Sequence, residues 1–117
     1  MSIPYLKTLA RFSLVTLIFM IFIVGAQPIA VNLFMPPLDK VVHSLTYGLL
    51  LLLAYFAFPK IKPIYLFLVV LSLGALDEIH QQYLIGRSPG LDDLLADFIG
   101  TSIAYLLIKV IDKRFKL

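Results

Sequence analysis

The stretch PIYLFLVVLSLGALDEIHQQ, residues 63–82, decides the fold because it is apolar along most of its length yet ends in charged side chains. Its uncharged part stops at Leu76. A helix needs roughly 17–25 residues to cross a bilayer, so this run is too short unless it takes in the residues that follow. We therefore expect a helix from 63 to about 82 that carries Asp77, Glu78 and His80 into or just at the membrane surface.

Three further apolar runs extend this pattern along the chain. The last run, from Phe98 to Ile108, is also too short to span a bilayer, so its helix must begin near Leu91 and take in Asp92, Asp93 and Asp97. The prolines in PKIKP and the segment GRSPG predict turns. The sequence predicts an all-α fold, a polytopic membrane protein whose single domain, residues 1–117, is a bundle of four transmembrane helices near 12–34, 41–58, 63–82 and 91–109.

Composition agrees with a membrane protein and excludes several other classes. Hydrophobic residues make up 61% of the chain and charged residues 15%, with a mean hydropathy of +0.97, whereas soluble domains are nearer half apolar and a quarter charged. The chain has no cysteine, which excludes disulfides, thiolate metal sites and a lipoprotein anchor. Its basic residues lie at the ends of apolar runs rather than along one face, so nucleic acid is excluded as a partner and the lipid bilayer is expected.

Charged residues are sorted between the two ends of the predicted helices. Six of the seven acidic residues and both histidines fall at one set of ends, and eight of the ten basic residues fall at the other. Cytoplasmic loops are rich in Lys and Arg, so we expect both termini and the 60–62 turn in the cytoplasm. Val24-Gly25-Ala26 resembles a signal-peptide cleavage site, but the apolar run before it is longer than a typical signal, which favours a retained helix.

Helical spacing indicates which polar side chains face neighbouring helices. Asp93, Asp97, Gly100 and Ala104 fall on one face of the last helix, and small residues four apart let another helix approach closely. A carboxylate facing lipid would cost several kcal/mol. We therefore expect Asp97 to face a neighbouring helix.

Several of these residues have ordinary structural explanations. Asp39 and Lys40 can form an interfacial ion pair, His43 can be a hydrogen-bonded packing residue, and Asp92 can complement the positive end of a helix dipole. These explanations do not account for Asp77 and Glu78 lying with Asp93 and Asp97 at one membrane face. Such carboxylates repel one another unless Lys40, Arg87, protons or a cation compensates, so the cluster indicates a functional site.

The same residues resemble a known family. The order DKxxHxxxY from Asp39, DExHQ from Asp77, GRS from Gly86 and DxxxDxxG from Asp93 resembles the VanZ-like family of small bacterial membrane proteins, named for a teicoplanin-resistance protein. The resemblance covers residues 39–104, although relatives often carry Asn at the position of Asp97. It implies a four-helix protein of the bacterial cytoplasmic membrane, linked in some members to glycopeptide tolerance.

Three functions remain open from the sequence. The first is handling of an envelope component, such as a lipid-linked or cell-wall precursor, at the outer face, by a hydrolase or transferase if the site is catalytic. The second is a non-catalytic module that binds a lipid or a partner, and the third is a small proton- or ion-coupled transporter, with an oligomer compatible with each. A divalent cation such as Mg²⁺, Mn²⁺ or Zn²⁺ would suit the ligands, although no metal-motif spacing is present. The candidate catalytic residues are Glu78, His43, Asp39 and Asp93, and the candidate substrate-binding residues are Lys40, Tyr47, Gln81, Arg87 and Asp97.

Overall fold

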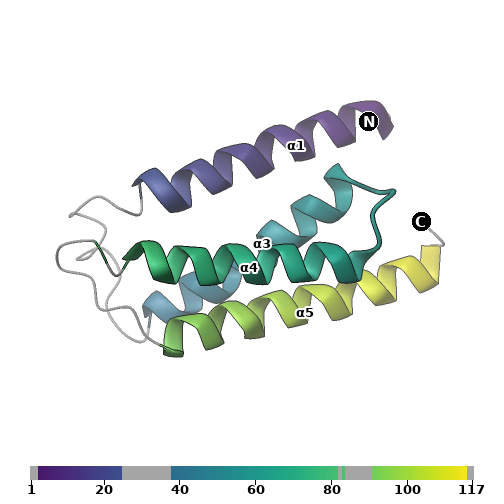
Figure 1. Cartoon of the computed structure of the whole chain (residues 1–117). Coiled ribbons are helices and arrows are strands. Elements are labelled where there is room, and N and C mark those ends of the chain that lie inside the picture. Colours follow the sequence, from purple (N-terminus) through teal and green to yellow (C-terminus); the bar gives the residue numbers. More distant parts are fainter. Residues whose placement is uncertain (1–2, 25–37, 82, 84–90, 116–117) are drawn as a thin grey trace.

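The computed structural model is a helical bundle in which consecutive helices run in opposite directions (Figure 1), and it describes residues 3–24, 38–81, 83 and 91–115. Its first helix continues into a short π-helical segment, and the N-terminal end of the first helix and the C-terminal end of the last lie at the same end of the bundle (Figure 1). The elements are α1 (Ile3–Phe19), η1 (Met20–Val24), α3 (Leu38–Ala57), α4 (Pro63–Gln81) and α5 (Leu91–Phe115).

The predicted all-α membrane fold is confirmed. The described residues contain no strand, and four helices in them are long and apolar enough to cross a membrane. The starts of α4 at Pro63 and of α5 at Leu91 are those expected from the sequence. Both helices also take in the acidic residues that the length argument assigned to them.

Two helix ends differ from those expected. α1 begins at Ile3 rather than near residue 12, and α5 continues to Phe115 rather than ending near residue 109. The expected ends were placed at basic residues, but Lys and Arg favour helices, and their long side chains can carry the charge to the membrane surface. The part of the first predicted span beyond Val24, including Gln27-Pro28, lies outside the described residues.

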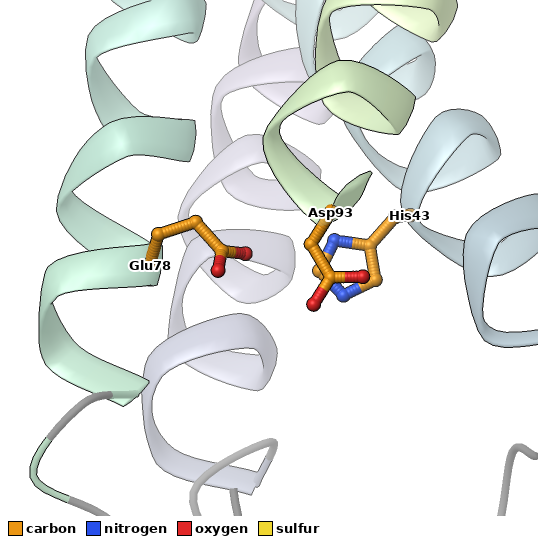
Figure 2. A group of neighbouring side chains, drawn as sticks. All are labelled: His43, Glu78 and Asp93. Carbon is orange, nitrogen blue, oxygen red and sulfur yellow. The ribbon is translucent and has the colours of Figure 1, made fainter. Parts of the chain in front are cut away.

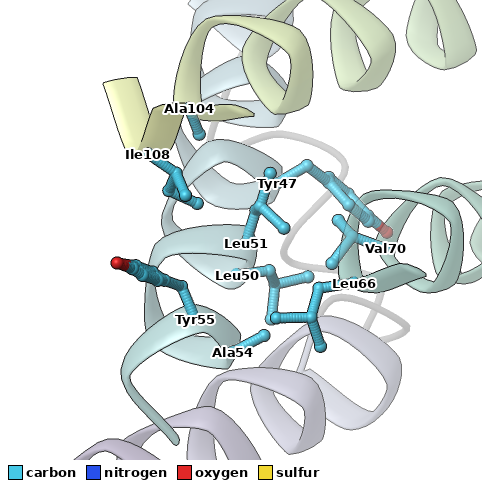
Figure 3. Close-up of a cluster of buried hydrophobic side chains, with 9 residues drawn as sticks. All are labelled: Tyr47, Leu50, Leu51, Ala54, Tyr55, Leu66, Val70, Ala104 and Ile108. Atoms are coloured by element: carbon cyan, nitrogen blue, oxygen red, sulfur yellow. The ribbon is translucent and has the colours of Figure 1, made fainter. Parts of the chain in front are cut away.

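The apolar core lies between α3, α4 and α5, with α3 contributing most of it. In Figure 3, Tyr47 extends from α3 towards Val70 of α4, while Ala104 and Ile108 approach α3 from α5. Leu50, Leu51 and Ile108 have no exposed surface. These side chains hold three helices together below the polar end of the bundle; the full cluster is Tyr47, Leu50, Leu51, Ala54, Tyr55, Leu66, Val70, Ala104 and Ile108.

By contrast, α1 lies at the periphery. Only 6% of its membrane span is buried, against 28% for α4 and 33% each for α3 and α5. One polar contact joins it to α3, where Arg11 Nε donates to the carbonyl of Ala57 at 3.0 Å, and the same guanidinium lies 5.3 Å from the centre of the Phe58 ring. The site at the other end of the bundle is therefore built mainly by α3, α4 and α5.

Small residues bring α3 and α5 into backbone contact. A Cβ atom added to Gly100 would lie 1.9 Å from the carbonyl oxygen of Ser44, and one added to Gly48 would lie 3.0 Å from the carbonyl oxygen of Gly100. The Ser44 hydroxyl donates to the carbonyl of Ala96 at 2.8 Å across the same interface. Only glycine leaves room for this approach. The side chains nearer the starts of α3 and α5 are therefore held close together.

Candidate functional site

The candidate site lies where α3 begins, α4 ends and α5 begins. Each helix presents polar residues there at helical spacing, Lys40, His43 and Tyr47 from α3, Asp77 and Glu78 from α4, and Asp93 and Asp97 from α5. All of these residues lie within the candidate membrane spans. In Figure 2, Glu78 extends from α4 towards His43 and Asp93, so three helices converge on one point.

Three side chains form the centre of this site. One ligand atom each from His43, Glu78 and Asp93 lies within 4.8 Å of the others. Glu78 is 8% exposed and Asp93 is 9% exposed, so the carboxylates are recessed rather than displayed on the surface. Charged groups at such depth are costly in a membrane and are typical of functional sites.

Asp97 contacts the imidazole ring of His43. Its Oδ1 lies 2.9 Å from His43 Nδ1, and its side chain is 1% exposed. Its Oδ2 is buried without a hydrogen-bond partner among the described residues, and it packs against Gly74, where a Cβ atom would lie 3.0 Å away. Asp97 therefore faces neighbouring helices, as its helical phase predicts, and it sets the orientation of the imidazole ring.

Lys40 neutralises part of the acidic cluster. Its Nζ lies 2.5 Å from Oδ1 of Asp93, which is 53 residues away in sequence. The side chain of Lys40 remains 34% exposed and that of Asp93 12%. The ammonium group thus stands at the rim of the site, where it can meet solvent or an anionic group.

A second buried contact ties α3 to α4. The Tyr47 hydroxyl donates to Oδ2 of Asp77 at 2.9 Å, and Tyr47 is 1% exposed. The rings of His43 and Tyr47 are stacked, with their centres 6.3 Å apart. The acidic cluster and the imidazole are therefore parts of one connected network rather than separate features.

Acidic side chains outnumber basic ones among the described residues of this network. Asp77, Glu78, Asp93 and Asp97 are buried together, and Lys40, His43 and Tyr47 contact members of this group. Carboxylates in a medium of low dielectric need protons, cations or donors to remain there. The site is therefore suited to acid–base chemistry or to holding a cation, and imidazole with carboxylate is a ligand set for divalent metals.

Several predicted site residues cannot be placed in this geometry. Asp39 and Gln81 belong to the helical backbones of α3 and α4, but their side chains are outside the described part, as is the whole of Arg87. Asp92 is exposed and lies in the first turn of α5, where the structural explanation expected it. Sequence reasoning missed Ser44 and Gly74, because nothing in a single helix reveals which residues of another helix they meet.

Comparison with known proteins agrees with the resemblance carried by these residues. The model of one family, described as VanZ/LLP1, matches residues 2–112. No curated protein and no solved structure matches the chain. Since the match covers α1, α3, α4, most of α5 and every residue of the polar network, the chain belongs to the VanZ/LLP1 family.

Proposed function

We propose that the chain is a multi-pass protein of the bacterial cytoplasmic membrane that binds and handles the polar part of a cell-envelope component at the outer membrane face. The component is lipid-linked or related to the cell wall. The observation that carries this proposal is the burial of His43, Glu78 and Asp93 together at one membrane face, each from a different helix. A merely structural bundle gains nothing from carboxylates placed in this way.

The orientation follows from the opposite end of the bundle. Eight of the ten basic residues lie near the N-terminus, in the 60–62 turn or near the C-terminus, and such residues favour the cytoplasm. The polar site then opens towards the extracytoplasmic leaflet, where envelope precursors are used. This sidedness also supports a role in glycopeptide susceptibility, because those drugs act outside the membrane.

Each side chain has a role suited to its surroundings. Glu78 and His43 are the candidate general acid and base, and Asp97 keeps the imidazole in place through its contact with Nδ1. Lys40, at the rim, is the partner for an anionic group. From the sequence pattern we propose Asp39 as a further catalytic residue and Gln81 and Arg87 as further substrate-binding residues.

A susceptibility assay tests the proposal. The chain is expressed in a glycopeptide-sensitive bacterium, and the teicoplanin concentration that inhibits growth is compared for the native chain, Glu78→Gln, His43→Ala and Asp92→Asn. We expect the native chain and Asp92→Asn to raise that concentration equally, because Asp92 is exposed. The other two variants should fall to the vector-only value at equal membrane abundance, and unchanged resistance in both would refute the proposal.

A second measurement separates an enzyme from a binding module. Native and Glu78→Gln protein are purified, co-purifying envelope lipids are identified by mass spectrometry, and the same lipids are then incubated with each protein. If Glu78 is an acid–base catalyst, turnover should fall by about 10²–10⁴-fold in the variant while the lipid is still captured. Capture without turnover by the native chain would favour the non-catalytic module.

A further inference from the structure

The centre of the site has the composition of a metal centre. We propose that His43, Glu78 and Asp93 bind one divalent transition-metal ion, Mn²⁺ or Zn²⁺, at the outer end of the bundle. The use of this ion to hold an anionic headgroup rests on the proposed function, but the ion site itself rests on the three side chains and their surroundings. Figure 2 shows these side chains turned towards one another from three helices.

The distances are close to those that a metal needs. Ligand atoms around a tetrahedral zinc ion lie roughly 3.3 Å apart, since each lies about 2 Å from the metal. In this site the three ligand atoms lie within 4.8 Å of one another. Rotation of the Glu78 and Asp93 side chains can close the difference without moving a helix, because both end in flexible carboxylates.

The histidine is oriented as a metal ligand. Its Nδ1 lies 2.9 Å from a buried oxygen of Asp97, so a proton on Nδ1 donates to that carboxylate and the lone pair remains on Nε2. Metal-binding histidines almost always have such a carboxylate or carbonyl behind them, which sets the tautomer and raises the basicity of the ligand. Asp97 is thus a positioning residue, and its 1% exposure shows that water does not compete for the contact.

The charge of the site also favours a dication. Glu78 and Asp93 supply two negative charges and His43 supplies a neutral nitrogen, while the nearby carboxylates of Asp77 and Asp97 add further negative potential. Lys40 contacts Oδ1 of Asp93, so the second oxygen of that carboxylate can serve the ion. Because the Lys40 ammonium and the metal share one carboxylate, the lysine weakens metal binding through electrostatic repulsion.

The mixture of imidazole and carboxylate ligands limits which metal ions the site would favour. Carboxylates alone favour Mg²⁺ or Ca²⁺, whereas an imidazole nitrogen favours transition metals such as Zn²⁺. Three protein ligands leave at least one coordination position for an oxygen of water or of an anionic group. A phosphate-bearing headgroup is the envelope chemistry that such an open position would take.

Direct titration tests the site. The full chain, in nanodiscs of phosphatidylcholine, is titrated with Mn²⁺ while free ion is followed by electron paramagnetic resonance, and with Zn²⁺ against a chelator of known affinity. We expect one ion per native chain. Glu78→Gln and Asp93→Asn should weaken binding by about tenfold or more, and Asp97→Asn by about 10–100-fold through the orientation of His43. The control, Asp92→Asn, lies on the same turn as Asp93 but is exposed, and it should bind as the native chain does.

Lys40→Met distinguishes a metal centre from general damage. A variant that merely disturbs the fold would weaken binding, whereas loss of the competing ammonium should tighten it by about threefold or more. Absence of a bound ion in the native chain overturns the inference. Equal binding by Glu78→Gln and Asp92→Asn also overturns it, because lipid or surface carboxylates would then hold the ion.

The failure of this inference can be told apart from failure of the proposed function. If the native chain binds no ion but Glu78→Gln still loses teicoplanin resistance, the metal centre is wrong and the proposed function stands. If the ion binds with the expected ligand dependence but Glu78→Gln keeps full resistance, the metal centre stands and the proposed function fails. Both measurements include Glu78→Gln and its control Asp92→Asn.

Discussion

The two ends of the bundle use the same helices in opposite ways. At the end built by the starts of α3 and α5, carboxylates and an imidazole are buried, and glycine brings the backbones together. At the other end the charged groups are mostly basic and exposed, and large apolar residues such as Ile108 pack between the helices. Polar contacts occur there too, between Tyr55 and Asp112 and between Arg11 and the carbonyl of Ala57, but Asp112 is partly exposed and Arg11 is exposed.

This difference shows how a small membrane protein can bury charge. Close backbone contact excludes lipid from the polar end, so that side chains on facing helices can satisfy one another. The basic end needs no such close backbone contact, because its long side chains reach water or lipid headgroups directly. The most demanding packing is therefore found next to the candidate site rather than in the apolar middle of the bundle.

The largest loss of stability should come from disrupting the close contact between α3 and α5 at Gly100. A Cβ atom in Gly100→Ala would lie 1.9 Å from the Ser44 carbonyl oxygen, so α3 and α5 must separate. We expect a loss of about 3 kcal/mol or more of unfolding free energy, the upper range for overpacking. Unfolding in mixed micelles of dodecyl maltoside and SDS measures it. Ile103→Ala, on the exposed side of α5, should change little, and equal losses would contradict the close contact.

A smaller effect should follow from removing one polar contact at the same end. Tyr47→Phe deletes the hydroxyl that donates to Asp77 Oδ2 at 2.9 Å, in a site that is almost fully buried. Hydrogen bonds to charged groups contribute about 1.5–3 kcal/mol, so a loss near the lower value is expected. The same micelle titration measures it, and a variant as stable as the native chain would show that this network is not needed for the fold.

The smallest effect should come from the matching change at the basic end. Tyr55→Phe deletes the hydroxyl that donates to Asp112, a partly exposed residue near the end of α5. A hydrogen bond beside water contributes about 0.5 kcal/mol. Comparing Tyr55→Phe with Tyr47→Phe thus tests the contrast between the two ends with the same atom removed. If Tyr55→Phe costs as much as Tyr47→Phe, the two ends do not differ as described.

Much of the fold follows from the sequence by counting. The uncharged runs before Asp77 and after Asp97 are too short to cross a bilayer, so the acids had to lie inside helices, and α4 and α5 include them. The same reasoning misplaced the start of α1, because it took Arg11 as the boundary of the first apolar run. A charged residue at the edge of an apolar run therefore does not mark the end of a helix.

The candidate site was less accessible to sequence reasoning. Helical phase assigned Asp97 and Gly100 to one face of α5 and predicted a close neighbour, but it could not say that the neighbours are Gly74 on α4 and Ser44 on α3. Nor could it show that Lys40 pairs with Asp93, 53 residues further along the chain. Contacts between helices depend on crossing angle and axial offset, which one sequence does not encode in a readable pattern.

The direction of the long-range polar contacts has a consequence for how the protein is made. The ribosome synthesises α3 before α4 and α5, and α3 carries Lys40, Ser44 and Tyr47, whose donors meet acceptors on the later helices. Inserting an isolated helix costs up to about 3 kcal/mol for an Asp at its centre, and less for one nearer its end, as Asp77 and Asp97 are. When α5 leaves the translocon, the hydrogen-bond donors of α3 are already in the bilayer and can contact the acceptors of α5. The order of the helices in the chain thus lets α4 and α5 enter the membrane after α3, which carries their hydrogen-bond donors. An engineered chain that begins with α5 would lose this stabilisation during insertion.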